Sequence, residues 1–533
     1  MSELFPTSAA EAGEPIPVPM NDTATGPQVT ADPARHELKR RTAHGALVST
    51  VAQGAALVLR TGSTMLLARL LLPADYGLVG MTTAFTGFLG LFRDGGLSMA
   101  SVQRDSITPA QSSTLFWVNL AVGVLLALLC AAIAPVLAVF YGEPRLVWVT
   151  VITGISFLFN GAGAQHRAIL QRSLRFITLS VIDTVGLVLS VALGIGMAVA
   201  GGKYWALVVM AITPPIVSTV GVWFATGWIP GLPQRRSGIR SMLWFGGTLT
   251  LNSVVIYMAY NMEKVLLGRY WGAETLGIYG RAYQLINLPT ETLNQTIGSV
   301  SFSALSRVQN DPARLRSYFM KGYGLLLSLV IPIAMACVLF ADDLIRVFLG
   351  AKWHESAPVF RLLAPTVVAV AMMNPLGAVL LATGRVVRNF NLALLITPVV
   401  ILGYVIGLRH GPQGVAAGYS IAMVLVIVPV VVWAKHGLPI SGMDILTTLK
   451  PPFVSVLVGT AVMLAAASVM ARIQPVFLRL VIESCLFLGI YAIVLLFAMK
   501  QKALYMNIVR ETGLWPISAW RQRAARAESA EGI

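Results

Sequence analysis

The chain contains a long series of apolar runs, and this feature restricts its fold more than any other. Each run exceeds the roughly 18 residues needed to cross the hydrocarbon core of a bilayer. We therefore expect an all-α polytopic membrane protein with about fourteen transmembrane helices. The expected spans are residues 44–70, 76–101, 113–140, 145–168, 177–200, 204–228, 239–268, 276–304, 318–341, 356–383, 389–409, 412–434, 446–471 and 476–499.

The composition agrees with that class. Only 12% of the residues are charged, against about 25% in soluble domains. Residues 1–32 have no basic start followed by an apolar core, so no cleaved signal is expected there. The first 43 residues, rich in Pro, Ala, Glu and Thr, are predicted to be a disordered tail.

The positive charges predict the orientation. An even number of spans places both termini on one side. Of the 39 Lys and Arg residues, 25 lie on that side, nine lie near the opposite side, and five fall inside spans. By the positive-inside rule, both termini are expected in the cytoplasm. The same rule explains the net charge of +16, so nucleic-acid binding is not expected.

A short stretch recurs at a fixed spacing and indicates an internal duplication. Each copy ends one apolar run, turns tightly and opens the next; the shared positions are Leu67/Leu267, Arg69/Arg269, Gly77/Gly277 and Gly80/Gly280. A second pair, residues 139–142 and 347–350, follows in the same order. We expect two six-helix lobes as a parallel repeat, with a cavity between them.

The duplication predicts the organisation of the whole chain. Two C-terminal helices lie outside the repeat and are expected to form an appended pair. The predicted parts are a cytoplasmic tail (1–43), the first lobe (44–228), a cytoplasmic linker (229–238), the second lobe (239–434), the helix pair (446–499) and a basic cytoplasmic tail (500–533).

Charged side chains inside spans are candidates for function, because a charge in the bilayer needs a cavity or a partner. Arg60 lies deepest, some sixteen residues into the first span, and is expected to face the cavity. Arg93 and Asp94 have a second interpretation, as an intrahelical or loop-end pair, and Glu263 and Lys264 have one as side chains that reach the headgroups. Arg281 is a further candidate.

The eighth span is too polar to face lipid. Pro289 removes one helical hydrogen bond and leaves a carbonyl free, which only a wet or protein-lined site tolerates. Asn287, Glu291 and Asn294 share one face of this helix. We therefore expect the polar side of the cavity to include them.

Other polar residues have plainer interpretations. Asp183 and Glu483 are expected to be interhelical hydrogen-bond partners. His166 is expected to be solvated, and Asp342 and Asp343 to be solvated caps of an amphipathic interfacial helix within residues 341–355. The three cysteines show no metal-ligand spacing, and no phosphate-binding loop is present, so neither a cofactor nor an enzymatic activity is expected.

Several segments resemble the polysaccharide transporter family, which contains the Wzx-type flippases for lipopolysaccharide and exopolysaccharide units. They are residues 263–268, 276–283, 302–309, 349–353 with 357–358, and 94–98 with 102–103. Ser303 departs from the pattern, because the family commonly has proline there. The resemblance covers roughly residues 40–500 and implies the fold of the multidrug/oligosaccharidyl-lipid/polysaccharide (MOP) superfamily.

The resemblance also implies a function. The cargo would be an oligosaccharide on undecaprenyl pyrophosphate, moved across the bacterial inner membrane by alternating access, with membrane lipids and the polysaccharide polymerase and export machinery as partners. The predicted ligands of the pyrophosphate and sugar are Arg60, Arg93, Lys264, Arg281, Asn287 and Asn294. Coupling to H⁺ or Na⁺ would use Asp94, Glu263 or Glu291.

Three alternatives stay open from the sequence. A multidrug or small-solute antiporter on the same fold predicts an acidic, aromatic-lined cavity. A saccharide polymerase or ligase needs a sizeable outer loop, which is absent here. A flippase for peptidoglycan precursors would be distinguished by being essential.

Overall fold

The computed structural model describes residues 53–93, 108–233, 240–308, 311–502 and 505; the side chains of residues 240–252, 289–304, 306 and 386 are outside that description. All regular structure in this part of the chain is helical. In chain order it comprises a helix at residues 53–70, α2 (Pro73–Arg93), α4 (Pro109–Tyr141), α5 (Leu146–Arg172), α6 (Phe176–Val199), α7 (Trp205–Thr226), α8 (Arg240–Arg307), α9 (Pro312–Leu339), α10 (Ala341–Phe348), η1 (Ala351–Trp353), α11 (Ser356–Ala382), α12 (Val386–Gly407), η2 (Leu408–His410), α13 (Gly411–Lys435), α14 (Gly442–Met470), α15 (Val476–Ile493) and a π-helical turn at Val494–Ala498.

Nine helical segments among the described residues are long and apolar enough to cross a membrane. Neither α2 nor α8 is one of them, and these are the helices that carry most of the polar side chains described below. The chain is therefore a multi-pass membrane protein whose most polar helices lie inside the bundle.

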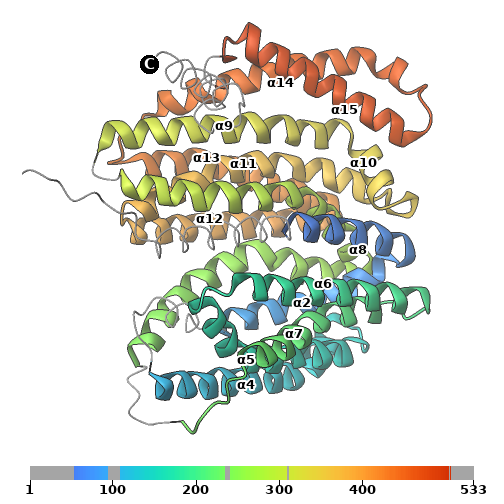
Figure 1. The fold of residues 1–533 in the computed structure, drawn as a ribbon. Coiled ribbons are helices and arrows are strands. Elements are labelled where there is room, and N and C mark those ends of the chain that lie inside the picture. Colours follow the sequence, from blue (N-terminus) through green and yellow to red (C-terminus); the bar gives the residue numbers. More distant parts are fainter. Residues whose placement is uncertain (1–52, 94–107, 234–239, 309–310, 503–504, 506–533) are drawn as a thin grey trace, which may run out of the picture.

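The helices form two lobes and an appended pair, as predicted (Figure 1). The helix at 53–70, α2 and α4–α7 make the first lobe, and α8–α13 make the second. Within the lobes α4 packs on α5, α6 on α7, α11 on α13 and α12 on α13, while α2 against α8 is the main contact between lobes. The pair α14–α15 lies against α9, on the side of the second lobe away from the first (Figure 1).

The helix α8 joins two predicted spans, 239–268 and 276–304, into one assigned element. Gly272 interrupts it with φ 80° and ψ −178°. This left-handed φ is strained for residues with a side chain but not for glycine. The chain therefore bends at Gly272, which divides α8 into two arms, residues 240–271 and 273–307.

The repeat produces a reciprocal contact between the lobes. A Cβ atom added to Gly77 would lie 1.6 Å from the carbonyl oxygen of Ala273, and one added to Gly277 would lie 1.9 Å from that of Pro73. Pro73 and Ala273 are themselves equivalent positions of the repeat. Such a swap of equivalent residues is what a two-fold axis between similar units generates. The duplication inferred from the sequence is thus visible in the packing.

The repeated arginines cross between the lobes in the same region. Arg69 donates a 3.0 Å hydrogen bond to the carbonyl of Val347, and the Arg269 guanidinium lies 5.7 Å from the centre of the Phe140 ring. Val347 and Phe140 belong to the two copies of the second repeated stretch. We call this region, formed by residues 71–73, Gly272 and residues 341–353, the closed end.

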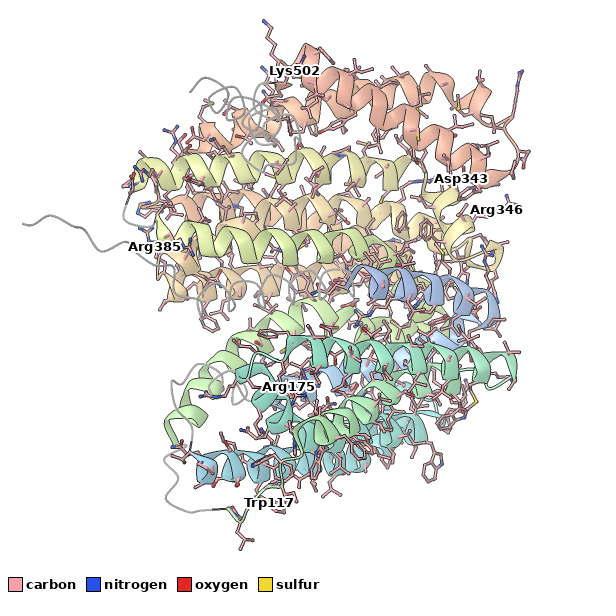
Figure 2. All side chains as sticks on the ribbon, viewed as in Figure 1. Trp117, Arg175, Asp343, Arg346, Arg385 and Lys502 are labelled. Carbon is pink, nitrogen blue, oxygen red and sulfur yellow. The ribbon has the colours of Figure 1, made fainter. Side chains whose placement is uncertain are left out.

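At the opposite end, both lobes contain an arginine that donates to a carbonyl at a helix end. Arg175, before α6, donates to the carbonyl of Ala225 at 2.9 Å, and Arg385, before α12, donates to the carbonyl of His436 at 2.9 Å. Each arginine thereby satisfies a carbonyl at the C-terminal end of a neighbouring helix, α7 for Arg175 and α13 for Arg385. Figure 2 shows Arg175 and Arg385 at the end of the molecule away from Asp343 and Arg346.

Candidate functional site

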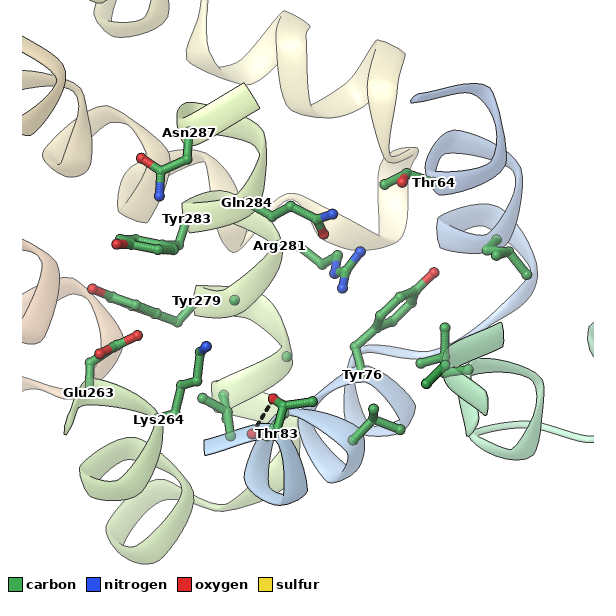
Figure 3. Close-up of a pocket in the computed structure, with 18 of the residues that line it drawn as sticks. Thr64, Tyr76, Thr83, Glu263, Lys264, Tyr279, Arg281, Tyr283, Gln284 and Asn287 are labelled. Carbon is green, nitrogen blue, oxygen red and sulfur yellow. Dashed lines mark hydrogen bonds between the residues drawn. The ribbon is translucent and has the colours of Figure 1, made fainter. Parts of the chain in front are cut away.

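A cavity of about 510 Å³ lies between the lobes near the closed end (Figure 3). The helix at 53–70, α2 and α7 form one side of it, and both arms of α8 form the other. Its polar and charged lining residues are Thr64, Tyr76, Thr83, Glu263, Lys264, Tyr279, Arg281, Tyr283, Gln284 and Asn287.

Equivalent positions of the two repeats line this cavity together, so it lies where the lobes are related to each other. The second lobe supplies the larger or more polar member at most of these positions. The pairs are Thr64/Lys264, Tyr76/Leu276, Val79/Tyr279, Gly80/Gly280 and Thr83/Tyr283. The scaffold is therefore nearly symmetric, but its chemistry is not.

Two cations come from either side of the turn at Gly272. The Lys264 Nζ donates to Asn261 Oδ1 at 2.7 Å and has no carboxylate partner among the described residues. The Arg281 guanidinium lies 4.0 Å from the centre of the Tyr76 ring, and its Nε has no hydrogen-bond partner in the described structure. Both cations therefore retain donors that a bound anion can use.

Glu263 is the acidic group of the cavity. It is 0% exposed, and neither carboxylate oxygen accepts a hydrogen bond from any residue that the structure describes. Tyrosine rings follow one another beside it, two pairs stacked and the middle pair tilted, with centroids 5.3–6.3 Å apart; in order they are Tyr279, Tyr283, Tyr419 and Tyr404. In Figure 3, Tyr279 and Tyr283 point to the Glu263 side while Arg281 points the opposite way, toward Tyr76.

Burying an ionised carboxylate that has no hydrogen-bond partner costs free energy. Such a group gains most by binding a proton or another cation. The second interpretation of Glu263 and Lys264, that both reach the headgroups, is wrong for Glu263 because its side chain is fully enclosed. Glu263 and Lys264 also form no ion pair with each other in the described structure.

The structure brings only some of the predicted site residues together. Lys264, Glu263, Arg281 and Asn287 all line the cavity. Arg60 is exposed and does not line it, although Thr64, one turn later, does and donates to the Arg60 carbonyl at 2.8 Å. Arg93, the last residue of α2, is also absent from the lining; Asp94 and the side chains of Glu291 and Asn294 lie outside the described residues.

Sequence reasoning missed the tyrosines and Gln284. A tyrosine in an apolar run resembles any core aromatic, so composition does not identify it. The register of the repeat would have found two of them, because Tyr279 and Tyr283 fall 200 residues after Val79 and Thr83, on the helix that faces the opposite copy.

Other predicted polar residues have structural roles. Asp183 accepts hydrogen bonds from both Nη groups of Arg167, at 2.8 and 2.6 Å, so its prediction as an interhelical partner is confirmed. The prediction for Asp343 is wrong: it is 9% exposed and pairs with Arg479 of α15, whose Nε lies 2.6 Å from Oδ2. Asp342 is solvent-exposed but also paired, with Arg361 at 2.6 Å.

The prediction for His166 is wrong as well. Its side chain is 0% exposed, and Nδ1 lies 2.7 Å from the Thr226 hydroxyl. The imidazole stacks on Trp223 at 4.4 Å between centroids, with Trp228 edge-on at 5.1 Å. These aromatic residues lie on and just after α7, so a position beside Arg167 at a helix end did not imply contact with water.

A second cavity, of about 360 Å³, lies within the second lobe. It is lined by the first arm of α8, α11, α12 and α13, and no charged side chain contributes to it. The cavity between the lobes combines cationic, acidic and amide groups, whereas this second cavity has amide groups but no charged ones.

The sequence model of a family described as "Polysaccharide biosynthesis protein" matches residues 66–358, which is more than half of the chain. The chain belongs to this family. The match includes the closed end and every residue of the cavity lining except Thr64. The resemblance to the polysaccharide transporter family is thereby confirmed.

Curated relatives support this assignment. The teichuronic acid biosynthesis protein TuaB of Bacillus subtilis (strain 168) is 32% identical over 305 residues, covering 56% of this chain and 62% of that protein. The lipopolysaccharide biosynthesis protein WzxC of Escherichia coli (strain K12) is 25% identical over 398 residues, covering 73% and 80%. The succinoglycan biosynthesis transport protein ExoT of Rhizobium meliloti (strain 1021) is 22% identical over 299 residues, covering 56% and 60%. The chain thus spans less than two thirds of TuaB and ExoT. Of these three relatives, ExoT is named as a transport protein.

Solved structures share the fold. The lipid II flippase MurJ in an inward closed conformation has a TM-score of 0.68 at 15% identity, covering 87% of this chain and 99% of that one. An inward-facing multidrug resistance transporter of the MATE family and MOP superfamily has a TM-score of 0.56 at 15% identity, covering 72% and 94%. The family member described here therefore has the MOP fold.

Proposed function

We propose that this protein moves polyprenyl-pyrophosphate-linked oligosaccharide repeat units across the cytoplasmic membrane by alternating access, for lipopolysaccharide or exopolysaccharide biosynthesis. The observation that carries the proposal is the cavity between the lobes, with Lys264 and Arg281 beside amide and phenol groups inside a membrane protein of the polysaccharide biosynthesis family. The relatives' names support the same class of cargo.

The chemistry of the cavity suits such a cargo. A pyrophosphate is recognised by charge-assisted hydrogen bonds, and guanidinium and ammonium groups are the usual donors. Lys264 and Arg281 would bind the pyrophosphate, and Gln284 and Asn287 would bind the first sugar. The polyprenyl chain would remain in the bilayer beside the gap between the lobes. The undecaprenyl carrier and a downstream polysaccharide polymerase belong to this proposal.

The other predicted ligands would extend the path away from the closed end. Arg60 is one turn from Thr64 of the cavity lining, and Arg93 ends α2. We propose that both meet the cargo before it reaches the cavity, together with Asn294. By the positive-inside rule, both termini and the linker at 229–238 would lie in the bacterial cytoplasm. The closed end would then face the outside, and the predicted boundaries of tails, lobes and helix pair would hold.

Glu263 would couple transport to an ion gradient. Its carboxylate is enclosed, has no described partner, and lies next in the chain to Lys264. A proton or Na⁺ bound there would change the charge of the cavity by one unit, and thus its affinity for pyrophosphate. Asp94 and Glu291 remain further proposals for the same role.

The test is the amount of lipid-linked saccharide in cells that lack the protein. Repeat units are expected to accumulate on the polyprenyl carrier while surface polysaccharide falls. Lys264→Ala and Arg281→Ala proteins are expected to restore less than about a tenth of export, because each removes a charge-assisted contact. Arg472→Ala, at an exposed position between α14 and α15, is the control and should restore export fully. Unchanged lipid-linked saccharide in the deletion strain would refute the proposal.

A multidrug antiporter is the second candidate. The observation in its favour is Glu263 beside stacked tyrosines, since a lipophilic cation would bind to an acid and aromatic faces. In that case the deletion strain would become sensitive to cationic drugs while its polysaccharide stayed unchanged, and Lys264→Ala would preserve or increase resistance.

A further inference from the structure

Three side chains connect the cavity to the closed end through contacts that cross the lobe boundary three times. Arg281 of the second lobe lies on the face of Tyr76 of the first, with its guanidinium carbon 4.0 Å from the ring centre. The Tyr76 ring meets Trp353 of the second lobe edge-on, at 5.4 Å and 70°. Trp353 Nε1 then donates a 2.8 Å hydrogen bond to the carbonyl of Ala68 in the first lobe.

Two of the three side chains are buried, and Arg281 is half-buried. Trp353 is 0% and Tyr76 6% exposed. The Tyr76 hydroxyl, like Arg281 Nε, has no hydrogen-bond partner in the described structure. The ring of Tyr76, rather than its hydroxyl, therefore makes the connection, by a cation–π contact on one side and an aromatic contact on the other.

The contact of Arg281 with Tyr76 is weaker than what an oxyanion offers. A guanidinium has five N–H donors in a planar fork and binds phosphate with two parallel hydrogen bonds. A ring face satisfies none of those donors. A pyrophosphate in the cavity would therefore compete successfully with Tyr76 for the guanidinium.

We propose that Arg281, Tyr76 and Trp353 form a substrate-sensing latch: a pyrophosphate bound in the cavity draws Arg281 away from Tyr76, and the loss of that support loosens the Tyr76–Trp353 contact that holds the closed end together. This inference rests on the proposed function, because it needs a pyrophosphate ligand. It assigns to Tyr76 and Trp353 a positioning role in transport.

Because of its location, release of the latch would affect the contacts between the lobes at the closed end. Tyr76 precedes Gly77, whose backbone packs directly on Ala273 of the other lobe. Lys352, next to Trp353, donates to the Leu71 carbonyl at 2.9 Å. A shift of Tyr76 therefore acts where α2 meets α8 and where η1 meets the end of the helix at 53–70.

The latch is tested by the distance between two spin labels at the closed end. Leu72 of the first lobe is 57% exposed, and Arg346 of α10 is exposed. Both would be replaced by cysteine in a full-length protein lacking Cys130, Cys337 and Cys485, labelled and reconstituted in liposomes. The probe is geranylgeranyl pyrophosphate, a lipid pyrophosphate without sugar, and its binding is measured in parallel.

Each variant has a distinct expected result. The probe should lengthen the label distance in the parent protein and in Tyr76→Phe, which keeps the ring. Tyr76→Leu should raise the ratio of open to closed protein about tenfold without the probe, since it removes both ring contacts. Arg281→Ala should lengthen the label distance without the probe, because it removes the support of Tyr76, and should abolish the response to the probe. Trp353→Phe keeps an aromatic ring beside Tyr76 but loses the hydrogen bond to Ala68 and part of the ring volume. It should give a smaller opening and serves if Tyr76→Leu does not fold.

The outcomes separate the latch from the proposed function. Probe binding by the parent without a change in distance overturns the latch and leaves the proposed function standing. A Tyr76→Leu or Trp353→Phe protein that behaves as the parent also overturns it. A parent that binds no lipid pyrophosphate overturns the proposed function and the latch together.

Discussion

The contact of Gly77 with Ala273 allows a sharp test of how the closed end is held. In Gly77→Ala the new Cβ would lie 1.6 Å from the Ala273 carbonyl oxygen, whereas real Cβ contacts are essentially never under 3.0 Å. The two backbones must therefore separate by at least the difference, 1.4 Å. Neither side can relieve the clash by rotating a side chain, because the obstacle is backbone.

That separation destabilises only the conformation in which the closed end is closed. Overpacking of this kind costs about 1–3 kcal/mol, which shifts a two-state equilibrium roughly 5- to 150-fold. The Gly77→Ala protein is expected to favour a form open at the closed end and to export less polysaccharide. Gly277→Ala should do the same, because it meets the Pro73 carbonyl at 1.9 Å. The double variant should cost less than the sum, since one displacement relieves both clashes.

The label pair at positions 72 and 346 measures this opening, and Gly62→Ala is the matched control. Gly62 lies in the helix at 53–70, and a Cβ there has nothing within 4 Å. The label distance should lengthen without any ligand in Gly77→Ala and stay unchanged in Gly62→Ala. A folded Gly77→Ala protein with the parental distance and parental export would refute the argument that backbone contact at this point holds the lobes together.

Three further outcomes follow from individual residues. Glu263→Gln keeps the shape of the side chain but not its charge, so transport in liposomes should lose its response to an imposed proton or sodium gradient; a parental response would show that the ion binds elsewhere. Arg479→Ala leaves the nearly buried Asp343 without its partner and should lower the free energy of unfolding by about 3 kcal/mol. The measurement is Tm in detergent, which should fall for Arg479→Ala but not for the exposed control Arg346→Ala. In the turn between α4 and α5, the hydrogen bond from Arg145 lowers the pKa of Glu143. The pair therefore stabilises the folded protein above the ordinary glutamate pKa, and this contribution is lost as pH falls through the lower pKa of the folded state. Because Arg145 is half exposed, Glu143→Gln should change the free energy of unfolding at acid pH by less than about 1 kcal/mol.

The sequence predicted the fold well because the bilayer restricts the choice of structure. Apolar length indicated helices, and the duplicated stretch indicated two lobes. The repeat did not reveal that Gly77 and Gly277 would meet the backbone of the opposite copy, since glycine in a helix has several uses. Only the folded structure shows which backbones approach.

The candidate site was predicted in part, and the errors share a cause. Lys264 and Arg281 were found because a charge inside a span is rare. Arg60 is equally deep in its run but lies off the cavity lining, because depth along a helix does not determine the face. Asp343 and His166 were placed in water, but their partners Arg479 and Thr226 come from helices 136 and 60 residues away. A pattern within one helix cannot predict partners that are so far apart in the sequence.

The asymmetry of the cavity bears on how a duplicated fold handles its cargo. The two copies supply equivalent positions, yet the first lobe contributes Thr64, Val79 and Thr83 where the second contributes Lys264, Tyr279 and Tyr283. A symmetric cation set would bind the cargo equally to both lobes and resist their separation. With its charges on the second lobe, the cavity can hold a pyrophosphate while the first lobe moves away, and the Arg281–Tyr76 contact is the one that a cation of the lining must give up. Moving a cation to the first lobe, as in Thr64→Lys, is therefore expected to tighten binding of geranylgeranyl pyrophosphate while slowing export, whereas faster export would show that the asymmetry is incidental.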